Sequence, residues 1–278
     1  MQSGIFQVRN LDSDAARDLA ANGVTLFRGN LFDPASIRAA MAGAHGVFSV
    51  QPNSGSANSD ITNDEEVRFG KSVVNLAVDS GVQHLVYSSA SILGKGPTGL
   101  ENLDCKLEIE DHVRRSDIAS TIIRPSTFME LLTLSGMGLD KGTISFFLHL
   151  EQPVELIASQ DIGKIVAAVL GNTERYSGQT ISIAGDELTG IEIQSAMTGA
   201  AGQPITYRRF PDALLEKNTF LRRNAELFDG GRAAGNTDIP ALSKEFGKLF
   251  NLKDWLKGPG MPRLLSALQA SQNEVALQ

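Results

Sequence analysis

Short apolar runs alternate with amphipathic helical segments along the first half of the chain, and this alternation constrains the fold more than any other feature. Runs that read as strands stand at 5–9, 24–28, 46–50, 84–88 and 119–124. Segments with apolar residues three and four positions apart follow them, at 15–22, 34–41, 64–80 and 103–115. Repeated strand–helix–strand units favour parallel pairing, so we predict an α/β fold, a Rossmann-like doubly wound parallel sheet.

The later half of the chain is less regular and indicates a second, smaller α/β lobe. We expect the Rossmann-like domain over residues 1–130, with a helix at 161–170 and a strand at 179–183 returning to it. Residues 131–257 mainly form the smaller lobe. The tail at 258–278 is interpreted as a loosely attached helix or as disorder.

Charge and cysteine content exclude several classes of protein. The net charge of −7, without a lysine or arginine run, argues against nucleic acid as a direct ligand. Cys105 is the single cysteine, so an internal disulfide is excluded and a reducing compartment is favoured. The four histidines lie far apart without metal-ligand spacing, and no apolar run reaches about 18 residues. We therefore expect a cytoplasmic protein without a metal site or a membrane span.

A glycine-rich phosphate turn is not found at the start of the first strand–helix unit. Dinucleotide sites of this architecture usually place Gly-x-Gly-x-x-Gly between a strand and a helix, whose N-terminus takes the pyrophosphate. The nearest cluster is Gly94-x-Gly96-x-x-Gly99, with Pro97 and Thr98 inside it. We expect no helix directly after Gly99 and interpret this segment as a flexible loop.

The order and spacing of short motifs resemble the NmrA-like group of atypical short-chain dehydrogenases/reductases over nearly the whole chain. Each motif alone is weakly specific, and their succession carries the resemblance. The motifs are Val8-Arg9-Asn10, Gly29 to Ile37, Gly46-Val47-Phe48, His84 to Ser89, Lys106 with Glu110, Ile123-Arg124-Pro125, Phe128-Met129-Glu130 and Asp161-Ile162-Gly163.

The resemblance implies an NAD(P)-binding protein, with NADP as the expected cofactor and NAD as the alternative. In this family a first strand, the glycine-rich turn and a helix precede the segment that matches Ile5 to Arg9. That strand would lie between the strands at 5–9 and 46–50. Either the chain is an incomplete version of a longer protein, which we favour, or its own strands close the gap differently.

The resemblance also assigns cofactor-binding positions, most of them at the carboxyl ends of strands. Arg9 matches an arginine that suits the 2′-phosphate of NADP, although a solvated strand-end charge is the alternative. Asn30 and Leu31 match positions beside the adenine. The remaining expected cofactor residues are Ser49, Val50, Gln51, Ser88, Ser89, Pro125 and Phe128. For Ser88 and Ser89, hydrogen bonding within a turn is an equally ordinary role.

Lys106 is the expected catalytic residue. Short-chain dehydrogenases use a Tyr-x-x-x-Lys pair, in which the lysine lowers the tyrosine pKa and holds the nicotinamide ribose. Here the tyrosine position is Asn102, so the tyrosine mechanism is absent and ribose binding is the role implied for Lys106. The alternative is a surface lysine paired with Glu110 one helical turn later.

Three functions remain open at this point. The first is an NAD(P)H-dependent oxidoreductase that reduces a small quinone-like or unsaturated acceptor. The second is a nonenzymatic NADP redox sensor that regulates transcription or signalling through a protein partner. The third is an incomplete chain that binds the cofactor weakly. The sequence predicts neither the substrate nor the oligomeric state.

Overall fold

Four parallel strands form the central sheet of the larger domain. Their order is β3 (Gly46–Ser49), β4 (His84–Ser88), β5 (Ser120–Pro125) and β9 (Thr180–Ile183). The computed structural model describes residues 4–53 and 60–270. In β4 the apolar residues Leu85, Val86 and Tyr87 are all buried, as expected for a central strand covered on both faces.

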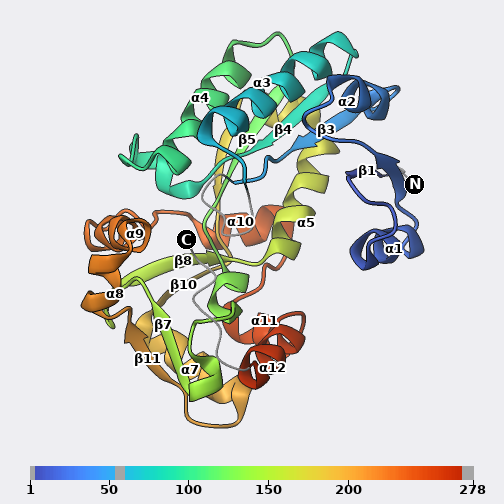
Figure 1. Ribbon diagram of the computed structural model, residues 1–278. Coiled ribbons are helices and arrows are strands. Elements are labelled where there is room, and N and C mark those ends of the chain that lie inside the picture. Colours follow the sequence, from blue (N-terminus) through green and yellow to red (C-terminus); the bar gives the residue numbers. More distant parts are fainter. Residues whose placement is uncertain (1–3, 54–59, 271–278) are drawn as a thin grey trace.

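Helices cover both faces of this sheet (Figure 1). On one face lie α3 (Asn63–Asp79) and α4 (Glu101–Arg115), and on the other α5 (Ser159–Leu170) with α10 (Ile239–Phe246). The start of α3 is fixed by a capping box, in which the Thr62 hydroxyl accepts a hydrogen bond from the backbone of Glu65 and the Glu65 carboxylate accepts one from the backbone of Thr62. The sheet is thus sandwiched between two helical layers, and this confirms the predicted Rossmann-like α/β architecture.

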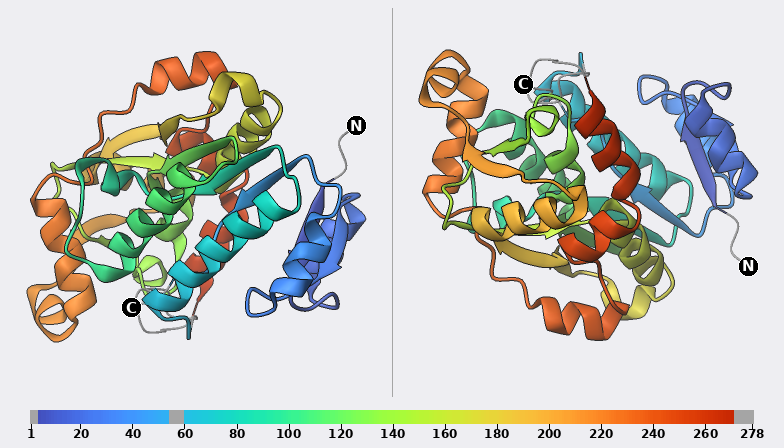
Figure 2. Two further views of the ribbon diagram at one scale, coloured as in Figure 1. Left: turned by 90° about the horizontal axis from the view of Figure 1, so that it is seen from above. Right: turned by 90° about the horizontal axis from the view of Figure 1, so that it is seen from below.

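The N-terminal strands form a separate two-stranded parallel sheet. It consists of β1 (Ile5–Val8) and β2 (Thr25–Arg28), joined by α1 (Asp14–Ala21), and α2 (Pro34–Met41) leads from it to β3. Ser13 caps α1 and Asp33 caps α2. Both views in Figure 2 show this unit standing apart from the main sheet.

Within the described residues, the strands do not close the gap between β1 and β3. β1 pairs with β2 and β3 pairs with β4, so each has one edge without a neighbouring strand in the described structure. Phe6 on β1 is 53% exposed and Phe48 on β3 is 38% exposed, whereas central strands of doubly wound sheets are usually buried on both faces. The alternative that the chain's own strands close the gap between β1 and β3 is therefore wrong for the described residues.

The smaller lobe begins where β5 ends and contains two small sheets. Strands β10, β8 and β6 form one sheet, and β11 and β7 form the other. Its elements are β6 (Thr127–Phe128), η2 (Met129–Thr133), η3 (Leu139–Lys141), β7 (Thr143–Phe146), β8 (Pro153–Ile157), β10 (Asp186–Thr189), α7 (Gly190–Ala201), β11 (Thr206–Arg209), α8 (Asp212–Lys217), α9 (Thr219–Asp229), α11 (Leu252–Lys257) and α12 (Met261–Gln269). Two short helices complete the larger domain, η1 (Ser91–Lys95) and α6 (Thr173–Tyr176).

The structure of this half differs from the sequence pattern at two places. The apolar spacing from Pro211 to Leu227 predicts one helix, but the segment is divided at Asn218, which ends α8 and caps α9 with its side chain. The segment after Gly258 is not loosely attached up to residue 270, because Leu264 of α12 is fully buried in the core of the lobe. Residues 271–278 lie outside the described structure, and so do residues 54–59 of the segment at 52–63, for which the Ser, Asn and Gly content predicts a loop.

No helix in the described ranges has the length and apolar character needed to cross a membrane.

Candidate functional site

The carboxyl ends of three neighbouring strands meet at one edge of the main sheet. Ser49 at the end of β3 lies opposite Tyr87 on β4, and Ser88 at the end of β4 lies opposite Ile123 on β5. Ligands of open parallel α/β sheets bind beyond this edge. The structure therefore places six of the predicted site residues at these strand ends, namely Ser49, Val50, Gln51, Ser88, Ser89 and Pro125, and it places the seventh, Phe128, on β6, three residues after Pro125.

Three buried polar atoms at this edge lack a hydrogen-bond partner among the described residues, and one of them is the hydroxyl of Ser89. The amide nitrogen of Gln51 donates to the Ser49 hydroxyl over 2.9 Å, but Oε1 of Gln51 is unpaired. The hydroxyl of Ser126, directly after β5, is unpaired as well. An unpaired buried polar atom is costly and usually marks a position that a ligand or water completes. The edge therefore fits a ligand with hydrogen-bonding groups.

Apolar surface lies beside these polar atoms. Val50 is 58% exposed and Phe128 is 40% exposed. Small-molecule sites commonly combine exposed apolar or aromatic walls with a few polar groups that fix orientation. The edge can therefore accept a flat, partly polar ring.

Lys106 does not pair with Glu110. Its ammonium forms an ion pair with Glu66 on α3, and the two side chains are 12% and 1% exposed. The alternative of a surface lysine paired with Glu110 is therefore wrong. A lysine ammonium has three N–H donors, so Lys106 can keep the bond to Glu66 and still donate to a ligand hydroxyl. Its role at the nicotinamide ribose remains a prediction.

Glu110 belongs to a different network. Its carboxylate is fully buried and accepts two hydrogen bonds from Arg124 at the end of β5, over 2.8 and 2.6 Å, and one from Arg114 over 2.7 Å. Burial alone would raise the pKa of Glu110, but the hydrogen bonds from Arg124 and Arg114, with the Ser89 hydroxyl nearby, lower it below its usual value. Glu110 is thus ionised at neutral pH and anchors α4 to β5.

Sequence reasoning missed both buried glutamates, although a signal was present. Glu66 precedes Val73 by seven positions and Ala77 by eleven, which places it on the buried face of α3. Glu110 directly follows the buried Ile109 and lies three positions before Val113. An acidic residue at the position of an apolar stripe indicates a buried ion pair, because isolated buried charges are too costly.

Arg9, Asn30 and Leu31 form a second group on the β1–β2 unit. Arg9 is exposed and has no ion-pair partner within the described chain. Oδ1 of Asn30 accepts a hydrogen bond from the backbone of Phe32 over 3.1 Å, and Leu31 packs against the core beneath α3. These contacts give Asn30 a turn role and Leu31 a packing role. The strands of this unit do not pair with the main sheet, and Leu31 is the member of the group that packs against the core of that sheet.

For the glycine-rich segment at 94–99 the sequence predicts a flexible loop without a helix directly after it, and the structure differs on both points. A helix does follow it, since α4 begins at Glu101, and the loop is held in place. Asp104 accepts hydrogen bonds from the backbone N–H groups of Thr98 and Gly99, over 2.7 and 2.8 Å. These donors are occupied, so the run does not form a phosphate cradle in the described structure.

Two basic side chains, Lys95 and Arg232, hold this loop against the smaller lobe through hydrogen bonds. Lys95 donates to the carbonyls of Gly231 and Ala234, over 2.9 and 3.0 Å. Arg232 donates in return to the carbonyls of residues 92, 96 and 97. The contact joins segments more than 130 positions apart, and no local sequence pattern indicates it.

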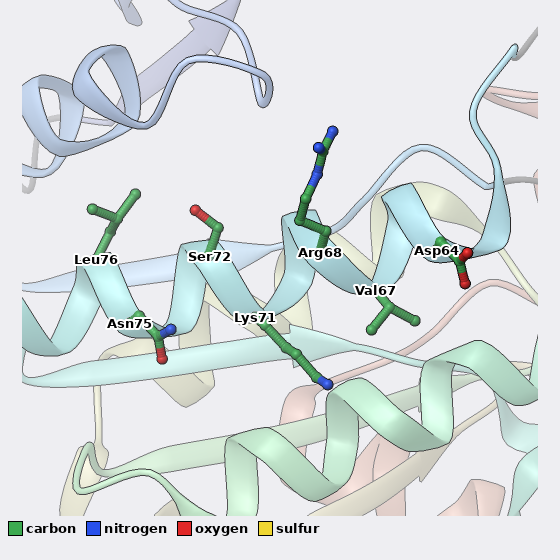
Figure 3. Close-up of a pocket in the computed structure, with 7 residues that line it drawn as sticks. All are labelled: Asp64, Val67, Arg68, Lys71, Ser72, Asn75 and Leu76. Atoms are coloured by element: carbon green, nitrogen blue, oxygen red, sulfur yellow. The ribbon is translucent and has the colours of Figure 1, made fainter.

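An open groove of about 510 Å³ runs along α3, away from the predicted site residues. Figure 3 shows Arg68, Ser72 and Leu76 projecting from one side of α3 and Lys71 from the other, toward α4, where it pairs with Glu108. None of the predicted cofactor residues lines this groove. We therefore place the candidate site at the strand ends.

The fold and its polar carboxyl edge define a Rossmann-like α/β protein. The chain belongs to the NmrA-like family, whose sequence profile matches residues 5–237. It is 28% identical over 206 residues to an NAD(P)H azoreductase of Xenophilus azovorans, covering 73% of this chain and 67% of that protein.

Solved structures with the same fold are more distant in sequence. An NADPH-dependent quinone oxidoreductase from Escherichia coli, complexed with NADPH, is 22% identical with a TM-score of 0.72, over 91% of this chain and 89% of that one. The negative transcriptional regulator NmrA, in complex with NAD, is 19% identical with a TM-score of 0.71, over 91% and 86%. The likeness extends to a reductase and to a regulator, so fold alone does not select a function.

Proposed function

We propose that this protein is an NAD(P)H-dependent oxidoreductase that reduces a small quinone-like or unsaturated acceptor. The observation that carries the proposal is the carboxyl edge of the sheet, where the unpaired polar atoms of Gln51 and Ser126 lie among exposed apolar side chains. The names of the azoreductase and quinone oxidoreductase relatives support the same class of reaction.

The residues present fit one end of the cofactor better than the other. Gln51 and Ser126 suit the amide and ribose of a nicotinamide, and Phe128 offers an apolar wall for its ring. Lys106 would hold the ribose hydroxyls, and Arg9 would bind a 2′-phosphate. When bound, the nicotinamide supplies the hydride. The chain's own residues position the ring and the acceptor and exclude water from their contact face.

The chain offers fewer free hydrogen-bond donors for the pyrophosphate of the cofactor. Four helices that follow strands have their first N–H groups occupied, by Ser13 in α1, Asp33 in α2, Thr62 in α3 and Glu130 in α5. Free N–H groups at a helix N-terminus supply much of pyrophosphate binding. We therefore expect the 1–278 chain to bind NADPH with a Kd weaker than about 1 μM.

Proton supply also differs from tyrosine-dependent relatives. Asn102 stands at the tyrosine position, and Tyr87 is buried with a pKa raised by burial and by the nearby Glu66 carboxylate. We propose that the reduced acceptor takes its proton from solvent. Quinone-like acceptors tolerate this, because their reduced oxygens are weakly basic.

The test compares two double variants. K106M/E66Q removes a largely buried pair without leaving a lone charge, and K71M/E108Q removes an exposed pair on the same two helices. We expect only the first to weaken NADPH binding, by about tenfold, in calorimetry. Equal effects in the two variants would remove Lys106 from the cofactor site.

A second candidate function is a nonenzymatic redox sensor, favoured by Asn102 in place of a proton donor. Turnover separates the two functions. NADPH oxidation on addition of 1,4-naphthoquinone supports the oxidoreductase. Cofactor binding without turnover of 1,4-naphthoquinone or an azo dye favours the sensor.

A further inference from the structure

A second groove, of about 310 Å³, lies between the segment that follows η2 and helix α12. Among the described residues, its walls carry three hydroxyl side chains, one guanidinium and small apolar residues, and no carboxylate. The lining residues are Thr133, Ser135, Pro262, Arg263, Ser266, Ala267 and Ala270. In a chain with a net charge of −7, a groove with a cation and no acid is suited to an anionic group.

One hydroxyl of this groove, the buried hydroxyl of Ser135, has no hydrogen-bond partner among the described residues. Thr133, which is 8% exposed, donates to the carbonyl of Glu130 over 3.0 Å and so fixes the wall that presents Ser135. A buried hydroxyl without a partner is costly unless a ligand or water completes it.

Arg263 supplies the charge. It is exposed and has no carboxylate partner in the described chain, whereas Arg175 pairs with Glu245 and Arg209 with Asp229. It stands in the first turn of the nine-residue helix α12, where the helix dipole also favours negative charge. The planar guanidinium binds carboxylate, sulfonate or phosphate oxygens through paired donors.

The groove lies close to the candidate site in the chain. Thr133 of the groove wall is the last of the five residues of η2, which begins directly after Phe128, and a 3₁₀ helix rises about 2 Å per residue. The wall at Thr133 therefore lies within about 10 Å of Phe128. A two- or three-ring acceptor can span this distance.

We propose that this groove binds an anionic substituent of the acceptor, with Arg263 as its cation and Ser135 and Ser266 as hydroxyl donors. This specificity site deepens the proposed oxidoreductase function and rests on it. Acceptors that carry a sulfonate, carboxylate or phosphate are then preferred over neutral acceptors with the same ring.

The probes are anthraquinone-2-sulfonate and neutral 2-(hydroxymethyl)anthraquinone. Their binding is measured by calorimetry on the full chain, with and without NADPH. We expect the sulfonate to bind about tenfold more tightly, R263Q to abolish that preference, and R263K to restore part of it. R208Q removes an equally exposed arginine of the same lobe and should leave the preference intact.

Two results overturn the proposal. One is a preference for the sulfonate that survives in R263Q, and the other is an equal loss in R263Q and R208Q. NADPH oxidation is followed in parallel. Turnover that does not depend on Arg263 refutes the anion-binding role of the groove but agrees with the proposed oxidoreductase function. A binding preference that depends on Arg263, without turnover, supports the anion-binding role and refutes the oxidoreductase function.

Discussion

Removing the charge of Glu110 should destabilise the larger domain by about 3 kcal/mol. Breaking one partner of a buried ion pair costs about 3–5 kcal/mol, because the remaining charge stays in a poorly solvated position. Arg124, whose side chain is 14% exposed, is held by two bonds to Glu110 and cannot return fully to water. Arg114 is about half exposed and resolvates, so its bond adds about 1 kcal/mol or less.

The assay is urea unfolding of E110Q against E108Q. Glu108 pairs with Lys71 on the surface, so E108Q should cost less than about 1 kcal/mol. With an m value of about 3 kcal/mol/M, the midpoint of E110Q falls by about 1 M. Because the folded pKa of Glu110 is lowered, its stabilisation is present above the ordinary value of 4.5 and is lost as pH falls through the folded pKa. Equal midpoints for the two variants, or a difference that persists at the acid end, would refute the reasoning.

Three further predictions concern other parts of the chain. Burial, with the nearby His45, lowers the pKa of His84. The stabilisation is therefore complete above the ordinary value of 6.5 and is lost as pH falls from there through the lower folded pKa. H84Q should flatten this dependence of stability on pH in urea unfolding, and an unchanged slope would contradict the reasoning. A Cβ on Gly260 would lie 2.5 Å from the Trp255 ring, so G260A should lower the free energy of unfolding by about 1–3 kcal/mol. The control G199A, on an open face of α7, should be neutral or stabilising in the same urea assay. R232M should speed amide hydrogen exchange at 92–97, because it removes the hydrogen bonds from Arg232 to three carbonyls of this loop. Unchanged exchange would show that these bonds do not hold the loop in place.

Much of the larger domain could be predicted because its signals are local. The strands at 46–49 and 84–88 and the caps at Ser13 and Asp33 follow from apolar runs and turn chemistry within a few residues. The division at Asn218 was missed because the apolar spacing continues through it, and only the cap that its side chain makes reveals the break. The burial of Leu264 depends on packing against a distant core, which no local pattern encodes.

The candidate site was predicted in part for the same reason. Strand ends identify Ser49, Gln51 and Ser88, since parallel strands bring their carboxyl ends together. Helical spacing suggests Glu110 as the alternative partner of Lys106, whereas the tertiary fold supplies Glu66 from a helix 40 positions earlier, which no local pattern indicates. The unused hydroxyl of Ser135 and the unpaired Arg263 are visible only once α12 is placed against the lobe.

The pairing of Lys106 with Glu66 limits what the lysine can contribute to a bound cofactor. The two charges cancel, so the pair presents N–H donors without net positive charge, and its donors suit neutral ribose hydroxyls better than a pyrophosphate. Phosphate charge then has to be met elsewhere, and Arg9 is the cation that the predicted set offers for it. Arg9 lies on the β1–β2 unit, which does not pair with the main sheet within the described residues. Cofactor affinity should therefore depend on how firmly that unit is held against β3, and a ligand that bridges Arg9 and Lys106 should protect β1 and β3 from hydrogen exchange together.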